Sequence, residues 1–106
     1  MLISIVRDFS DTPGPRFRHE GDFSGQAFLE DLLEPKYIEA AKSGAKLTVD
    51  LDGTEGYATS FLEAAFGGLA RKHPPESVLG TIDFKCEDEP LLKNEITFYI
   101  KEARNK

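Results

Sequence analysis

The chain has 106 residues, of which 40% are hydrophobic and 30% are charged, and its 19 acidic and 13 basic residues leave a net charge of −6. This length predicts one domain over residues 1–106, large enough to bury a core without a metal, and the single cysteine excludes an intrachain disulfide. The acidic balance argues against non-specific binding to nucleic acid or to an anionic membrane surface, but it leaves a basic protein partner open.

The N-terminal stretch MLISIVRDF does not resemble a secretion signal, because its apolar part is short and a charge follows at once. No apolar run approaches the roughly 20 residues of a membrane-spanning helix. A single cysteine is typical of proteins in a reducing compartment. We therefore expect a cytoplasmic location and no contact with a membrane.

The N-terminal segment is expected to form an antiparallel β-hairpin. Residues 2–9 are rich in β-branched side chains, which predicts a strand. A cluster of turn residues follows at 10–15, and residues 16–20 then alternate between basic and aromatic side chains. A short, charged second strand of this kind suits the edge of a sheet, where charge hinders pairing with other molecules.

Two helices are expected next. Ser24 is suited to cap the N-terminus of a helix whose apolar residues recur at helical spacing. Pro35 lacks a backbone donor and interrupts that pattern, although proline is favoured in a first helical turn. Residues 35–42 are therefore expected to form a second, short helix that stops at Gly44.

The clearest pattern in the chain is a strand followed by a turn and a helix. Apolar and polar residues alternate over residues 46–52, which predicts a strand with one apolar face. Gly53 and Gly56 end this strand, and helical spacing begins at Phe61 and continues to residue 72. The expected buried stripe of this helix consists of Phe61, Leu62, Ala65, Phe66 and Leu69.

The C-terminal third predicts one more strand and one more helix. Pro74 and Pro75 forbid continuation of the preceding helix. Residues 78–85 are expected to form a strand, and the acidic, proline-containing stretch 87–90 is expected to start a last helix, which continues to residue 103.

The expected order of elements is β-β-α-β-α-β-α, an α/β fold. Strands that alternate with helices need crossover connections and a largely parallel sheet. The polar face of strand 46–52 indicates that helices cover mainly one face, because a strand covered on both faces is apolar throughout. We therefore predict two layers: a mixed, mostly parallel four-stranded sheet with helices mainly on one face.

Several motifs in this frame resemble a known family. The stretch VDLDGTEGYATSFLEAAFGGLAR, together with GPRF and EGDFSGQAF upstream, is similar to the bacterial STAS-like domains of unknown function. These motifs lie within residues 13–71, about half of the chain. The family is named for its likeness to STAS domains, the fold of anti-sigma-factor antagonists, so the resemblance implies a STAS-like fold.

The resemblance also implies a regulatory function. In STAS antagonists a serine at the start of the helix that follows a strand and a short turn is phosphorylated by an anti-sigma factor with a histidine-kinase-like ATPase fold. By position, Thr59 and Ser60 match the hydroxyl pair of that motif, and Leu62 matches its leucine. Ala58 and Phe61 stand where the motif has an aspartate and a glycine. The resemblance thus implies Ser60 and Thr59 as candidate phosphoacceptors and a histidine-kinase-like ATPase as partner.

Ser60 also has a purely structural interpretation. The sequence Ser60-Phe61-Leu62-Glu63 fits a capping box, in which the serine hydroxyl accepts from the backbone of Glu63 and the Glu63 carboxylate reaches back. Such a cap contributes about 1 kcal/mol. A phosphate at the same place would meet free N–H groups and the positive end of the helix dipole. The sequence leaves both interpretations open.

The working surface is expected on the turn after strand 46–52 and on the exposed side of the helix that follows. This hypothesis describes a small, non-enzymatic module for signalling through protein–protein interaction, which needs no cofactor and no metal. The residues expected to contact the partner are Asp52, Gly53, Thr54, Glu55, Gly56, Tyr57, Glu63 and Gly67.

Two alternative functions belong to other classes. Asp50 and Asp52, with Glu55, form an acidic cluster at the end of a strand, which suits a metal-dependent hydrolase or phosphotransferase. A structural subunit of a homo-oligomer would instead pair through the edge strand at residues 16–20.

Two local features also allow two interpretations each. Arg16 and Arg18, beside a turn rich in glycine and proline, suit either solvated charges or a site that holds an anion or a carboxylate. Gly67 and Gly68 inside a helix cost about 1 kcal/mol each relative to alanine. They indicate either close packing of this helix or a flat spot that admits a partner.

Overall fold

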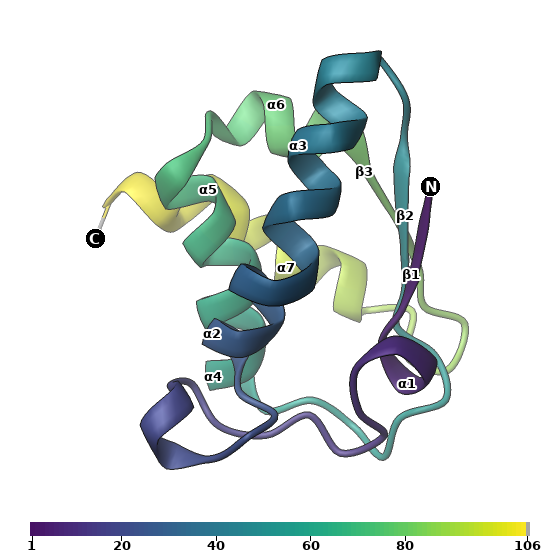
Figure 1. Cartoon of the computed structure of the whole chain (residues 1–106), viewed down its shortest axis with the longest axis vertical. Coiled ribbons are helices and arrows are strands. Elements are labelled where there is room, and N and C mark those ends of the chain that lie inside the picture. Colours follow the sequence, from purple (N-terminus) through teal and green to yellow (C-terminus); the bar gives the residue numbers. More distant parts are fainter. Residues whose placement is uncertain (106) are drawn as a thin grey trace.

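The computed structural model describes residues 1–105, in which three parallel strands form one sheet and the helices gather beside it (Figure 1). The strands are Leu2–Ser4 (β1), Leu47–Asp50 (β2) and Ile82–Lys85 (β3). The helical elements are Ile5–Asp8 (α1), Arg18–Glu20 (η1), Gly25–Phe28 (α2), Leu29–Leu33 (η2), Glu34–Ser43 (α3), Thr59–Leu62 (α4), Glu63–Gly67 (η3), Gly68–Lys72 (α5), Pro75–Thr81 (α6), Leu92–Glu102 (α7) and Ala103–Asn105 (η4).

The sheet has β2 at its centre, and the helices of residues 1–105 lie mainly on one side of it (Figure 1). β1 and β3 both pair with β2 in parallel, so that Ile3 lies opposite Val49 and Val49 lies opposite Phe84. Ile3 and Val49 are buried, whereas Leu2 is 51% exposed and Asp83 is exposed. The prediction of an α/β fold with a largely parallel sheet is therefore confirmed.

The predicted fourth strand is wrong. Arg16 and Phe17 lead into the 3₁₀ turn η1, and the backbone of Pro15 and Arg16 bonds to the start of α2 rather than to the sheet. The Gly25 N–H donates to the Pro15 carbonyl at 2.8 Å, and the Gln26 N–H donates to the Arg16 carbonyl at 3.0 Å. An alternation of side chains over only five residues is weak evidence for a strand, and here the backbone bonds to a neighbouring helix instead. The sheet therefore has three strands, and the predicted order of elements is incorrect.

The opening strand is shorter than predicted, because the chain turns into α1 after Ser4. The Ser4 hydroxyl caps α1 by accepting from the Arg7 N–H at 3.4 Å, and the Ser4 N–H donates to the Asp8 carboxylate at 2.8 Å. Ile5, although β-branched, lies in this helical turn and is fully buried. Burial and capping thus outweigh the intrinsic preference of residues 5–9 for a strand.

The elements α2, η2 and α3 form one continuous helix over residues 25–43 instead of two helices. Ser24 caps it as predicted, because its hydroxyl accepts from the Ala27 N–H at 3.0 Å. The middle turn η2 is π-helical, and the Glu34 N–H bonds to the Leu29 carbonyl five residues back. This wider turn accommodates Pro35, which has no N–H to donate and would clash in a regular α-helix.

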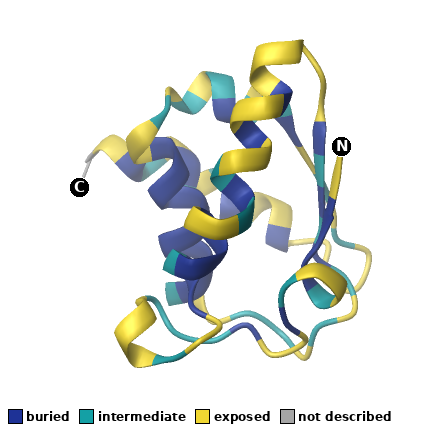
Figure 2. Ribbon diagram, in the orientation of Figure 1, coloured by how far each residue is buried: buried dark blue, intermediate teal, exposed yellow. Residues whose placement is uncertain are grey.

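The elements α4, η3 and α5 likewise form one helix over residues 59–72, called the central helix below. It is the most buried element of the fold (Figure 2). Every residue from Phe61 to Ala70 is buried, because η3 packs against α2, η2 and α7. At Gly25 the approach is so close that a Cβ atom would lie 2.6 Å from the Phe61 carbonyl oxygen. The predicted stripe of apolar residues therefore belongs to a stretch, Phe61–Ala70, in which the residues between the apolar ones are buried as well.

The predicted strand at residues 78–85 is half helix. Pro74 and Pro75 end one helix and begin the next, α6, with Pro75 in its first turn. Val78 is part of α6 and its side chain is buried, and β3 starts only at Ile82. Over residues 1–105, no helix combines the length and the apolar character that crossing a membrane requires.

Candidate functional site

The turn between β2 and α4 lies at the carboxyl end of the sheet, beside α1. Gly53 and Gly56 have φ values of +92° and +131°, which side chains rarely allow. A Cβ atom on Gly53 would also lie 3.1 Å from the Val6 side chain. The Glu55 N–H donates to the Asp11 carbonyl at 2.9 Å, so the turn is fixed against α1 and the loop that follows it.

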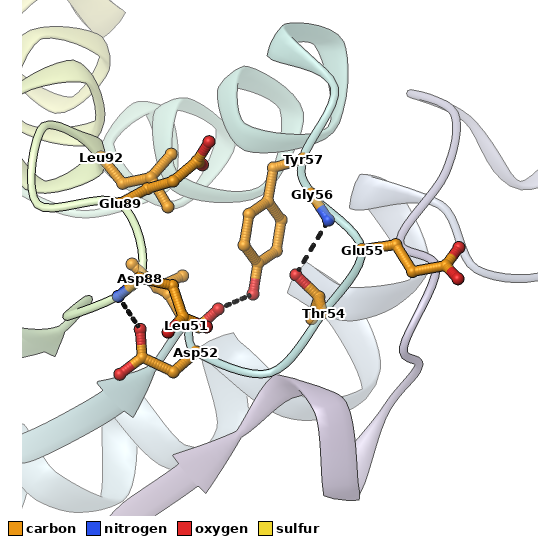
Figure 3. A pocket seen from close by; sticks show the side chains of 9 residues that line it. All are labelled: Leu51, Asp52, Thr54, Glu55, Gly56, Tyr57, Asp88, Glu89 and Leu92. Atoms are coloured by element: carbon orange, nitrogen blue, oxygen red, sulfur yellow. Dashed lines mark hydrogen bonds between the residues drawn. The ribbon is translucent and has the colours of Figure 1, made fainter.

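A hollow of about 140 Å³ lies between this turn and the start of α7 (Figure 3). The Tyr57 ring stands in it, and its hydroxyl donates to the Leu51 carbonyl at 2.7 Å. Burial raises the pKa of Tyr57 to about 12, so the phenol stays neutral and acts as a hydrogen-bond donor at physiological pH. The hollow is lined by Leu51, Asp52, Thr54, Glu55, Gly56, Tyr57, Asp88, Glu89 and Leu92.

Two aspartates join the loops that follow β2 and β3. Asp52 Oδ1 accepts from the Asp88 N–H at 2.9 Å, and the Gly53 N–H donates to Asp88 Oδ2 at 2.9 Å. The bond from the Asp88 N–H, supported by the Lys85 ammonium 3.1 Å from Asp52 Oδ2, holds the pKa of Asp52 below its usual range. The Asp52 carboxylate therefore stays charged and connects the loop after β2 to the loop after β3.

The carboxylates predicted as metal ligands, Asp50 and Asp52, are instead paired with Lys85. Lys85 Nζ lies 3.8 Å from Asp50 Oδ2 and 3.1 Å from Asp52 Oδ2. Figure 3 shows the Glu55 carboxylate directed away from Asp52. In residues 1–105, no three His, Cys, Asp or Glu side chains are grouped in a way that would hold a metal ion.

The predicted phosphoacceptors lie at the start of the central helix. Thr59 is its first residue and is exposed, and Ser60 follows and is half-buried. The N-cap is Ala58, which has no side-chain hydrogen bond to offer. The predicted capping box is therefore wrong, because the helix starts earlier than expected and Glu63 bonds elsewhere.

Tyr99 of α7 lies beside Thr59. Its hydroxyl donates to Glu95 Oε2 at 2.6 Å. Burial, followed by this hydrogen bond, raises the pKa of Tyr99, while a hydrogen bond with Thr59 acts in the opposite direction. The Thr59 hydroxyl and the Glu95 carboxylate of α7 thus both contact the Tyr99 hydroxyl, which lies between them.

Two of the predicted partner contacts are interior residues. Glu63 is 5% exposed, and its carboxylate bonds to Arg16 and, at 2.7 Å, to Arg71 Nη1. Gly67 is buried beneath it, since a Cβ atom there would lie 2.7 Å from Glu63 Oε2. The expectation that this helix has an exposed working side is wrong over Phe61–Ala70.

The other predicted residues are brought together as expected from the sequence. Five residues of the turn line one hollow, and the loop before α7 adds two acidic residues, Asp88 and Glu89, which the sequence argument did not assign to the site. The sequence did contain a signal for this part of the site, because the acidic stretch 87–90 directly follows a predicted strand. The carboxyl ends of neighbouring parallel strands meet at one edge of the sheet, which places this stretch near the turn after strand 46–52. The contributing residues that were missed are Asp88, Glu89, Leu92, Glu95 and Tyr99.

Comparison with known proteins identifies one family. Residues 24–91, well over half of the chain, match the family described as STAS-like domain of unknown function (DUF4325). The match includes β2, the turn, the central helix and β3. No curated protein and no solved structure matches the chain.

Proposed function

The chain belongs to the family of STAS-like domains of unknown function, and from this premise we propose that it is a regulatory protein-interaction module. Its partner is a protein, by analogy with STAS antagonists one with a histidine-kinase-like ATPase fold. The partner docks on the turn from Asp52 to Tyr57 and on the adjoining starts of the central helix and α7. The switch is phosphorylation of Thr59 or Ser60.

The observation that carries this proposal is the position of the two hydroxyl residues. β2 leads through a fixed turn into the first turn of a helix of 14 residues, and Thr59 is exposed at its first position. The first amide groups of a helix lack partners within the helix, and the dipole favours negative charge there. A phosphate on Thr59 or Ser60 would therefore be accepted locally without unfolding the helix.

The surroundings supply a reason why such a phosphate would change binding. Thr59 contacts Tyr99, which is bonded to the Glu95 carboxylate, and the nearby loop exposes Asp88 and Glu89. An added phosphate carries roughly −1.5 to −2 charges at pH 7 and would be repelled by these carboxylates. Phosphorylation is thus expected to alter both the charge and the side-chain arrangement of this surface.

The same surface offers chemistry for a partner. Its carboxylates suit basic residues, and two apolar side chains of the α7 region lie exposed beside them: Leu91 at 76% and Phe98 at 59%. These are the largest exposed fractions among the large hydrophobic side chains of residues 1–105. Apolar anchors surrounded by charge are typical of protein–protein contacts.

The proposal is tested by phosphorylation and binding together. The tagged chain is used to capture partners from its source cells, a captured ATPase is purified, and the chain is incubated with that protein and ATP. We expect an intact mass increased by one phosphate, which Thr59→Ala or Ser60→Ala abolishes and Ser43→Ala, an exposed hydroxyl at the end of α3, does not.

A second readout separates the switch from mere docking. Thr59→Glu places a negative charge at the helix start. It is expected to weaken partner binding by about tenfold or more, because repulsion from the Asp88, Glu89 and Glu95 carboxylates of the same surface rearranges the side chains that the partner contacts. An unchanged mass after incubation with the active ATPase, together with unchanged affinity of Thr59→Glu, would reject the phosphoswitch. Failure of the turn variant Tyr57→Ala to affect binding would reject the docking surface.

A further inference from the structure

A second hollow lies on the central helix and shares no residue with the one at the turn. It is a groove of about 300 Å³ between the Arg16–Phe17 segment and the second half of the helix. This volume is at the lower end of the range for small-ligand sites, about 300–1,000 Å³. The groove is lined by Arg16, Phe17, Gln26, Leu29, Glu30, Ala64, Gly68, Arg71 and Lys72.

Two guanidinium groups converge in this groove because one buried carboxylate holds both. Arg16 Nη1 bonds to Glu63 Oε1, and Arg71 Nη1 bonds to Glu63 Oε2. The arginine side chains are 34% and 37% exposed, whereas the Glu63 side chain is 7% exposed. A guanidinium carries five N–H donors, so each arginine retains donors on Nε and Nη2 beyond those on the Nη1 atom that contacts Glu63.

Cations outnumber anions in the lining of the groove. Three of its lining residues are cations, and Lys72 is 49% exposed, with the Glu34 carboxylate 3.6 Å from its ammonium group. Glu30, the one lining anion, accepts from Arg18 at 3.0 Å. In a chain with a net charge of −6, three lining cations against one lining anion form a local excess of positive groups, of which the Glu63 carboxylate offsets one charge.

The floor of the groove is apolar. Leu29, Ala64 and Gly68 form it, and Phe17 stands at the rim with 46% of its surface exposed. Gly68 keeps the floor flat and close to η2, since a Cβ atom there would lie 2.8 Å from Leu29 Cδ2. A ligand that fits therefore needs an apolar body next to its charged group.

Glu63 begins the π-helical turn η3, an irregularity that recurs at functional sites. A buried carboxylate carries a desolvation cost, and apolar replacement of such a charged cluster is often neutral or stabilising. The Glu63 carboxylate orients the guanidinium groups of Arg16 and Arg71 toward the same groove, which an apolar residue at position 63 would not do.

We propose that this groove binds an organic carboxylate. The carboxylate group accepts from Arg16 and Arg71 in the paired geometry that guanidinium groups favour, and the apolar body covers Ala64 and Gly68 against Phe17. An inorganic phosphate fits less well, because Glu63 already offsets one of the positive charges and phosphate leaves the apolar floor uncovered. This site is independent of the phosphoswitch at Thr59.

The test is an NMR titration of the full chain with phenylacetate, observed at the Nε–Hε signals of Arg16 and Arg71 and at the amide signals of Ala64 and Gly68. We expect saturable shifts with a dissociation constant on the order of 1 mM, as for a small ligand with one charged contact. Acetate, which lacks the apolar body, and phenylacetamide, which lacks the charge, are each expected to bind at least about tenfold more weakly. Inorganic phosphate serves as the fourth probe.

Variants locate the site. Arg71→Gln and Phe17→Ala are each expected to weaken phenylacetate binding about tenfold or more, while Lys42→Gln, which removes an exposed charge on α3, leaves it unchanged. Phe17 is exposed, so its variant stays folded even if Arg71→Gln does not. The proposal is overturned if phenylacetate gives no saturable shift, if phenylacetamide or phosphate binds equally well, or if Phe17→Ala leaves the affinity intact.

Discussion

The charged cluster at the carboxyl end of the sheet and the charged cluster on the central helix are each built around one carboxylate, but the partners of the two carboxylates differ. At the turn, Asp52 is paired with Lys85 and with backbone amides beside water. On the helix, the Glu63 side chain is 7% exposed and bonds to Arg16 and Arg71. The comparison teaches that a partly exposed carboxylate can divide its bonds between one cation and the backbone amides of a loop, whereas the more deeply buried carboxylate bonds to two cations.

The two clusters also tie different parts of the chain together. The Asp52 cluster connects the loops after β2 and β3, which are adjacent strands. The Glu63 cluster connects the loop before α2 to a helix that lies 47 residues further along the chain. Loss of the second should therefore affect the fold more than loss of the first.

The largest expected effect comes from removing the buried charge. Glu63→Ala leaves two arginines without their carboxylate and opens space in η3, so the free energy of unfolding should fall by about 2–3 kcal/mol, below the full cost of a buried pair because both arginines are partly exposed. Asp52→Asn should cost less than about 1 kcal/mol. Chemical denaturation of both variants measures the difference, and equal losses would contradict the contrast between the clusters.

An intermediate effect is expected at Tyr57, which joins the exposed turn to the core. Tyr57→Phe loses the hydrogen bond to the Leu51 carbonyl and should reduce stability at pH 7 by about 1 kcal/mol. The pKa of Tyr57 is raised in the folded state to about 12, compared with roughly 10 in an unfolded chain.

The sign of the pH dependence follows from this shift. The folded state keeps the phenolic proton longer, so its contribution is complete below about pH 10 and is lost as the pH rises toward 12. Urea unfolding between neutral pH and pH 11 should show a decline for the wild type and a flatter profile for Tyr57→Phe. Parallel profiles would show that Tyr57 is not the group responsible.

The smallest effect is expected at Ser60. Because the N-cap is Ala58 and no side chain caps this helix, Ser60→Ala should change the free energy of unfolding by less than about 0.5 kcal/mol. A capping serine would contribute about 1 kcal/mol. Thermal or chemical unfolding of Ser60→Ala and of Ser24→Ala, a true cap in the same protein, distinguishes the two.

Elements with strong local signals were predictable. The alternation over residues 46–52 gave β2, and the helix of residues 59–72 was found to within one or two residues. The Ser24 cap was correct because Ser24 bonds to an amide three residues away, a contact that needs no distant partner.

The errors occurred where distant contacts decide the local structure. Residues 5–9 and 78–81 are compatible with strands, but they form helical turns that bury Ile5 and Val78. Residues 16–20 lack sheet partners because their neighbours bond to Gly25 and Gln26. The burial of Glu63 also escaped prediction, since a glutamate followed by small apolar residues suits a surface helix until Arg16 and Arg71 are placed beside it.

The amino-acid sequence by itself determined the parallel α/β class, the family, and the strand–turn–helix segment that presents Thr59 and Ser60, because alternation, glycine turns and proline stops act over a few residues. The tertiary structure decided how many strands join the sheet, which face of the central helix meets water, and which charges meet one another. Those outcomes depend on burial and pairing between residues far apart in the chain, and the position of Glu63 between two arginines is the clearest example.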